Sequence, residues 1–410
     1  MTAEILFYFI IGFILINFTL DKILDALNAK HFNDALPEPI QDVYEEEDYK
    51  KSQQYKAVRY RFGLISSTFS LVVTIAFLLL DGFEFVDNIA RSFTDNPIGI
   101  ALVFFGIIVI GSDLLSLPFS YYSTFVIEEK FGFNKTTLKV FILDKIKGLF
   151  LMAVVGGGVL ALVVWFYHAS GEYFWLYAWG LMAVFTLFMN MFYSKLIVPL
   201  FNKQTPLNQG DLRNKISEYA QTVGFKLDKI FVIDGSKRST KANAYFSGFG
   251  KEKRVTLYDT LINDLEEEEI VAVLAHEVGH YKKKHIIFNL VASILLTGLT
   301  LFVLSLCISN PILSEALGVA IPSFHIGLIA FVLLYTPISA FTGLIMNLFS
   351  RAFEYQADNF AKNTYKPEPL IKALKTLSKK SLSNLTPHPA YVFVHYSHPT
   401  LLQRIKNLRS

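Results

Sequence analysis

Cysteine is almost absent from this 410-residue sequence, which contains one, Cys307. A single cysteine excludes an internal disulfide and a metal cluster held by several thiolates. Because Cys307 lies in an apolar run, we interpret it as a small hydrophobic side chain. Charge is scarce too. Charged residues make up 18% of the chain and the formal net charge is +3, which is too small to predict a nucleic-acid partner.

Apolar residues, by contrast, are abundant. They make up 52% of the chain, with 38 Phe among them, and the mean hydropathy is +0.40. Seven apolar stretches approach the roughly 20 residues that a helix needs to cross a bilayer: residues 5–20, 62–80, 97–117, 148–167, 174–197, 286–305 and 324–349. The first lacks the basic start and the small-residue cleavage site of a signal peptide, so we interpret it as a helix too. The sequence therefore predicts an all-α, multi-pass membrane protein.

A histidine pair carries the strongest chemical signal in the chain. Residues 276–280 read His-Glu-Val-Gly-His, which is the H-E-x-x-H pattern. On a helix, His276 and His280 point from one face toward a single cation. Glu277 between them lies close enough to take a proton from a water molecule at that cation. The pattern is typical of zinc hydrolases.

A catalytic zinc site needs a third protein ligand and an open position for water. The candidate ligand is Glu354, which follows the last predicted span. Asp358 lies one helical turn further on the same face. Glu354 can therefore bind the metal, while Asp358 accepts the free N–H of a ligand histidine. The alternative is an amphipathic helix beside the membrane with two solvated acids.

Two polar regions are predicted to fold outside the lipid, residues 201–285 and the tail from Arg351. In the first we expect strands at 229–234, 243–247 and 254–258, with a turn at 248–253. Asp264 is predicted to cap the helix that carries the histidine pair, and the acidic run 266–269 to be its solvated start.

The chain thus divides into four parts: residues 1–200 with five spans, 201–285 with the histidine helix, 286–350 with two spans, and 351–410 with the third ligand.

Basic residues predict how the chain is oriented. Lys and Arg number seven, one, five, none, fourteen and none in successive loops between the predicted spans, and ten in the tail. By the positive-inside rule, the N-terminus lies outside or in a lumen and the C-terminus in the cytoplasm. The zinc site is then on the cytoplasmic side, in a bacterial inner membrane or the endoplasmic reticulum.

The sequence resembles the type I CAAX prenyl proteases, which are seven-span zinc endopeptidases of the gluzincin kind. The resemblance extends beyond the histidine helix to residues 122–130, 132–135, 201–203, 236–239, 243–246, 354–358 and 395–399. It implies seven transmembrane helices enclosing a water-filled chamber. It also implies a small α+β metalloprotease region on the cytoplasmic side.

The resemblance also implies roles for individual residues. One zinc ion per chain would be bound by His276, His280 and Glu354. The catalytic residues would be Glu277 as general base, Asp358 as the partner of a ligand histidine, and His398 as the donor that stabilises the oxyanion.

Substrate binding is implied at the strand formed by Asn243, Ala244, Tyr245 and Phe246, beside which the peptide would lie. Lys241 departs from the family's eukaryotic members, which favour a smaller or His-like residue near this point. The departure leaves their substrate preference open for this chain.

The predicted function is a membrane-embedded zinc endopeptidase that cuts near the C-terminus of a CAAX-type, prenylated protein. Its partners would be that peptide or protein and the lipid bilayer. A broad-specificity protease for misfolded membrane proteins is the first alternative. Site-two-type and heat-shock membrane proteases fit less well, because the motif is not inside a span and five spans precede it. A catalytically inactive prenyl-lipid carrier is the alternative of another class, and an intact Glu277 argues against it.

The other histidines carry weaker signals. His285 is nine residues after His276, off the ligand face, so we interpret it as a membrane-interface residue. His388 and His395 share the tail with His398, and only the family resemblance favours His398 among the three.

Overall fold

The computed structural model describes residues 2–227, 229–248 and 253–410. Within them, six helical segments are long and apolar enough to cross a membrane. They are α1 (Ala3–Lys30), α2 (Glu46–Leu79), Pro97–Glu128 (α4, Pro97–Tyr122, with the π-helical η2, Ser123–Glu128), Leu138–Phe201, α12 (His285–Cys307) and α14 (Phe324–Thr364). All seven predicted spans lie in these segments.

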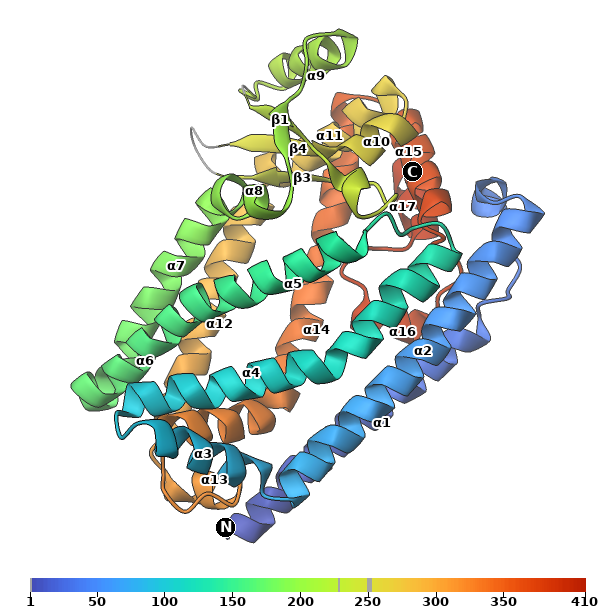
Figure 1. The fold of residues 1–410 in the computed structure, drawn as a ribbon. Helices are drawn as coiled ribbons and strands as arrows, with labels where there is room; N and C mark the ends of the chain where they lie inside the picture. Colours follow the sequence, from blue (N-terminus) through green and yellow to red (C-terminus); the bar gives the residue numbers. More distant parts are fainter. Residues whose placement is uncertain (1, 228, 249–252) are drawn as a thin grey trace.

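The segment Leu138–Phe201 contains two of the predicted spans. It consists chiefly of α5 (Leu138–Leu151), α6 (Gly157–Ser170) and α7 (Phe174–Leu196). The chain reverses at Gly171, whose φ of 54° is in the left-handed region that glycine adopts without a steric penalty. After it, α7 runs back alongside α6 (Figure 1). Counting this segment as two crossings gives the expected seven.

Elements outside the membrane-spanning segments lie at both ends of the molecule (Figure 1). Short helices α3 (Gly82–Phe93) and α13 (Pro311–Glu315) cover the end near the N-terminus. There His325 at the start of α14 is buried and its Nε2 lies 2.7 Å from Asp87 Oδ1, while Arg91 donates to the same carboxylate at 2.7 Å. His325 is thus part of a structural ion-pair cluster, far from the histidine helix.

The other end holds a four-stranded sheet in the order β1-β2-β4-β3. Its strands are β1 (Gln204–Pro206), β2 (Ile230–Ile233), β3 (Ala244–Ser247) and β4 (Arg254–Tyr258). β2 and β4 are parallel and the other two pairs antiparallel, so β3 is an edge strand. The three predicted strands are confirmed, whereas β1 was missed because it is only three residues long. In the predicted turn at 248–253, residues 249–252 lie outside the described part of the chain.

The histidine helix is α11 (Glu267–Lys282). It buries a continuous apolar face that includes Ile270, Leu274 and Val278. The face packs into one core with the sheet and the helices α9 (Asp211–Thr222), α15 (Pro367–Lys380) and α17 (Leu401–Arg409). Such burial, at about 25 cal/mol per Å² of apolar surface, fixes α11 against its neighbours.

The predicted start of this helix was wrong. Asp264 instead ends the short helix α10 (Asp259–Asp264), and Leu265 and Glu266 are extended. Glu266 is the N-cap, in a capping box with Glu269, whose carboxylate accepts from the Glu266 amide at 3.0 Å. Glu269 is only 3% exposed and pairs with Lys372 at 3.1 Å, so the acidic run is not simply a solvated start.

A close helix contact places the third candidate ligand. At 41 residues, α14 is about 60 Å long, twice the roughly 30 Å of a bilayer core, so its second half reaches the sheet end. There α11 crosses it at Gly279. A Cβ on Gly279 would lie 3.1 Å from the Ala357 Cα and from the Phe360 Cβ. These distances are shorter than most Cβ contacts, so a side chain at residue 279 would require the two helices to shift.

We therefore expect Gly279→Val to destabilise the protein, since overpacking of this kind costs about 1–3 kcal/mol. The thermal unfolding midpoint of the purified protein in detergent measures the effect. Gly180→Val in α7 is the matched control, because a Cβ there meets nothing within 4 Å. Equal midpoints for the two variants would contradict the close contact.

Candidate metal centre

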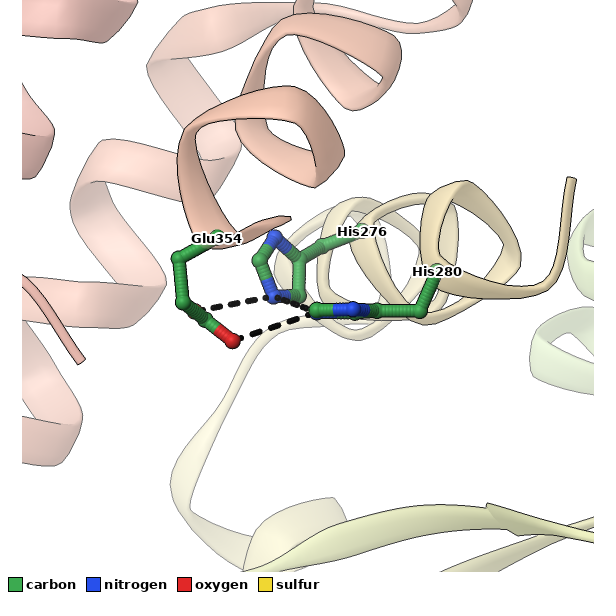
Figure 2. Close-up of side chains that lie close together, drawn as sticks. All are labelled: His276, His280 and Glu354. Carbon is green, nitrogen blue, oxygen red and sulfur yellow. Dashed lines mark hydrogen bonds and ion pairs between the residues drawn. The ribbon is translucent and has the colours of Figure 1, made fainter. Parts of the chain in front are cut away.

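Three side chains from two helices converge at the sheet end of the protein (Figure 2). His276 and His280 of α11 hold their Nε2 atoms 3.1 Å apart. Glu354 of α14 places Oε2 at 3.4 Å from His276 Nε2 and Oε1 at 3.2 Å from His280 Nε2. The structure thus brings together the three predicted ligands, which lie up to 78 residues apart in the chain.

The geometry of this group fits zinc. Two ligand atoms about 2.0–2.1 Å from a tetrahedral cation lie about 3.3 Å from each other, which is close to all three separations. Glu354 Oε2 is buried and makes no hydrogen bond within the described residues; His276 Nε2 at 3.4 Å and Arg404 Nη1 at 3.5 Å are its charged neighbours. A buried carboxylate oxygen that makes no hydrogen bond is costly unless cations stabilise it. The donor set, the spacing and this oxygen therefore all suit a divalent metal.

His276 has a second set of partners behind the group. Its Nδ1 lies 2.9 Å from Asp358 Oδ1, as the sequence predicted. Asp358 is fully buried and receives two hydrogen bonds from Arg404 of α17, at 2.9 Å from Nε and 2.6 Å from Nη2. Sequence reasoning missed Arg404, because ten basic residues of the tail were equally plausible partners for the acid.

The electrostatics of the group favour positive charge at its centre. Burial and the nearby Arg404 lower the pKa of the His276 imidazole, but hydrogen bonds to Asp358 and Glu354 outweigh both and raise it to about 9. Asp358 likewise raises the pKa of the Arg404 guanidinium despite its burial. The two carboxylates therefore stabilise a cation at this point in the fold.

His276, His280 and Glu354, which we call the metal-ligand group, border a cavity of about 390 Å³. Glu277 is half-buried in its wall. The four residues predicted to bind substrate, Asn243, Ala244, Tyr245 and Phe246, line the same cavity from the edge strand. Residues predicted for two different roles thus meet at one site.

His398 is the tail histidine that reaches the group. Its Nε2 is 3.3 Å from Glu354 Oε1, and its side chain is 62% exposed. His388 instead caps the helix α16 (Pro389–His395) by accepting from the Ala390 amide, and His395 lies 4.0 Å from Asp21. The structure separates three histidines that spacing alone could not rank.

The prediction that His285 lies away from the ligand histidines was wrong, although it does begin the membrane-spanning helix α12. It is 3% exposed, and its Nδ1 lies 3.0 Å from His280 Nδ1. The helical pattern misled the prediction because the helix does not continue from His280 to His285: α11 ends at Lys282.

Comparison with known protein families shows to which family the chain belongs. Residues 206–410 match the model for peptidase family M48, and residues 25–203 match the model for the CAAX prenyl protease N-terminal region with five membrane helices. The chain belongs to the M48 peptidase family.

Relatives of this M48 peptidase match it over nearly their whole length. The CAAX prenyl protease 1 homolog of Oryza sativa subsp. japonica is 39% identical over 382 residues, which are 91% of this chain and 90% of that protein. CAAX prenyl protease 1 of Saccharomyces cerevisiae is 35% identical over 424 residues, 97% of this chain and 94% of that protein. The crystal structure of S. mikatae Ste24p matches with a TM-score of 0.95 at 35% identity, over 100% of both chains.

The comparisons confirm several predictions. The protein is a multi-pass membrane metallopeptidase that uses zinc, in a lipid environment and with a peptide or protein as substrate. Its mostly helical fold with a small sheet is confirmed as well.

Lys241 of this M48 peptidase is held away from the metal-ligand group. Its Nζ lies 2.9 Å from Glu128 Oε2 and 3.1 Å from the Tyr55 hydroxyl, and 4.3 Å from the Phe133 ring centre. The long cation therefore ties the chain just before β3 to the membrane helices α2 and η2. These contacts fix the position of the segment that leads into the edge strand.

Removing Arg404 should weaken the fold as well as the site. Arg404→Met removes the guanidinium from the buried Asp358 carboxylate and leaves it only His276 as a partner, a loss of up to about 3–5 kcal/mol. We expect a lower thermal unfolding midpoint of the metal-free protein. Arg409→Met, at an exposed position of the same helix, is the control and should leave the midpoint unchanged.

Proposed function

We propose that this M48 peptidase hydrolyses a peptide bond near the C-terminus of CAAX-type, prenylated proteins. One arrangement carries the proposal: the metal-ligand group and the edge strand β3 border the same cavity. Relatives that match the whole chain are named CAAX prenyl proteases, and this supports the same substrate class.

In this proposal His276 and His280 bind one zinc ion through Nε2, and Glu354 binds it through its carboxylate. Asp358, held by Arg404, accepts the Nδ1–H of His276 and so leaves Nε2 free for the metal. The four-part division of the chain stays a prediction alongside these roles.

Bound zinc would supply a water molecule of lowered pKa and polarise the peptide carbonyl. Glu277 takes the proton of the attacking water and later delivers it to the leaving amine. His398 donates a hydrogen bond to the carbonyl oxygen as it becomes negative. One donor of this kind is worth about 3 kcal/mol in the barrier. The exposed His398 ring, beside Glu354, can turn toward that oxygen.

The edge strand offers main-chain groups to the peptide. The Tyr258 amide donates to the Asn243 carbonyl at 3.0 Å, so Asn243 and Tyr258 form a hydrogen-bonded pair of the antiparallel ladder. By alternation, Ala244 and Phe246 turn their N–H and C=O groups to the free edge, where the Ala244 amide donates to Asn243 Oδ1 at 2.8 Å and a bound peptide would replace that contact. A substrate peptide pairs with these groups as an added strand, which gives affinity with little side-chain selection.

We further propose that the sheet end faces the cytoplasm and the N-terminus the outside or a lumen. The two chain ends lie at opposite ends of the molecule (Figure 1). The loops and the tail at the sheet end carry most of the Lys and Arg residues, which supports this orientation. The membrane is the bacterial inner membrane or the endoplasmic reticulum.

The low burial of the membrane helices supports the proposal that they enclose a water-filled chamber. At most 17% of the most apolar window of each candidate span is buried inside the protein. Side chains that do not pack against neighbouring helices can face the lipid on one side of a span and an interior space on the other. In the proposal, seven helices enclose it and the zinc site faces into it.

A broad-specificity endopeptidase for misfolded membrane proteins is the second candidate function. Main-chain recognition by β3 favours it, because strand pairing accepts many sequences. The two candidates differ in whether cleavage requires the prenyl group.

The general-base role predicts that Glu277→Gln keeps zinc but loses cleavage. We expect one zinc ion per chain by elemental analysis and a loss of kcat of at least about 100-fold, since a positioned base contributes 10²–10⁴-fold. Undiminished turnover by Glu277→Gln would contradict the general-base role.

Paired farnesylated and unmodified C-terminal peptides, cut by the wild type, separate the two candidate functions.

The edge-strand role predicts that Ala244→Pro lowers kcat/KM about 2- to 10-fold, because the N–H that it removes contributes about 0.5–1.5 kcal/mol. The β3–β4 ladder stays intact, since this amide faces outward. Ala244→Ser keeps the amide and is the control. If both variants cut equally well, the peptide does not pair here.

A further inference from the structure

The two histidines of the metal-ligand group are supported in different ways. Behind His276 stands the charged pair of Asp358 and Arg404. Behind His280 stand two side chains without a fixed charge. His285 Nδ1 lies 3.0 Å from His280 Nδ1, and His285 Nε2 lies 3.2 Å from Gln356 Oε1.

A backbone reversal makes this contact possible. In a continuous helix, residues five apart point about 140° away from each other, so His280 and His285 would not touch. Here α11 ends at Lys282, and Lys284 has left-handed backbone angles, φ 62° and ψ 25°. The chain turns at this point, and His285 at the start of α12 folds back onto His280.

The position of the His285 ring is fixed by α14. The ring stacks on Phe353 with 4.2 Å between centres and 8° between planes. Phe353, Glu354 and Gln356 belong to one turn of α14. That turn thus supplies a ligand carboxylate, a platform for His285 and an acceptor for its Nε2.

We propose that His285 and Gln356 are positioning residues that set the tautomer of His280. Gln356 Oε1 can only accept, so His285 Nε2 carries the hydrogen. A neutral His285 then accepts at Nδ1, and His280 must donate its Nδ1–H to it. The lone pair of His280 is left on Nε2, which faces His276 and Glu354. This inference rests on the proposed metal centre and names residues that orient it.

The affinity for zinc tests this hydrogen-bond relay, which runs from Gln356 through His285 to His280, independently of peptide cleavage. It is measured on the purified full-length protein in detergent, by competition with a chromophoric chelator. His285→Phe keeps the stacking but cannot accept, and we expect affinity to fall about 10- to 100-fold, as for other losses of such partners. His285→Gln can accept from His280 and donate to Gln356, so it should recover most of the affinity. His388→Phe controls for loss of a tail histidine.

Gln356 is exposed, so its variants test the relay without disturbing the core. Gln356→Glu only accepts and should keep the affinity. Gln356→Lys only donates, which reverses the relay and puts the hydrogen on His280 Nε2, so affinity should fall. Ala352→Glu and Ala352→Lys, exposed and one turn earlier on α14, control for added charge. We expect the zinc affinities of the Glu and Lys variants to differ more at residue 356 than at residue 352.

Two results would overturn the relay: wild-type affinity in His285→Phe, or equal Glu-to-Lys differences at residues 356 and 352. A wild-type protein that binds no zinc would instead contradict the proposed function itself. The two failures are therefore distinguishable.

Discussion

The packing of α11 against α14 is the contact on which the rest of this structure depends. The ligand histidines belong to a helix of the sheet end, whereas Glu354 belongs to a helix that begins at the opposite end and crosses the membrane. Because Gly279 lets the two backbones meet, one turn of α14 reaches the histidines. A soluble fragment with the H-E-x-x-H helix alone would lack both the third ligand and the partners of both histidines.

The surroundings of the metal-ligand group combine two kinds of support. A carboxylate held by a guanidinium lies on one side, and a histidine with an amide lies on the other. Bound zinc contributes two positive charges and Arg404 one, against one negative charge each from Glu354, Asp358 and Glu277. The sum is zero. An acid in place of the buried His285 would unbalance it, and a low-dielectric site penalises unpaired charge.

Much of this arrangement was predictable from sequence, for identifiable reasons. Spans depend on local hydropathy, and the H-E-x-x-H spacing depends on one helix, so both are visible in a short window. Glu354 and Asp358 form a local pair as well. Arg404 was not predictable, since it approaches Asp358 only through the packing of α17, 46 residues further along the chain. His285 was misread because a left-handed residue, Lys284, interrupts the helical period. The cap of α11 was placed two residues early because Asp264 is of a type that commonly caps helices, whereas Glu266, which occupies the cap, is not.

The distance in sequence between the histidine pair and Arg404 has a consequence for the synthesis of the protein. Translation proceeds from the N-terminus at about 5–20 residues per second. Arg404 follows His280 by 124 residues, so the ribosome adds it about 6–25 s after the second histidine. During that interval α12 and α14 are synthesised while the histidine pair has no complete set of partners. The metal centre of each chain can therefore be completed only after its last membrane helix has been made.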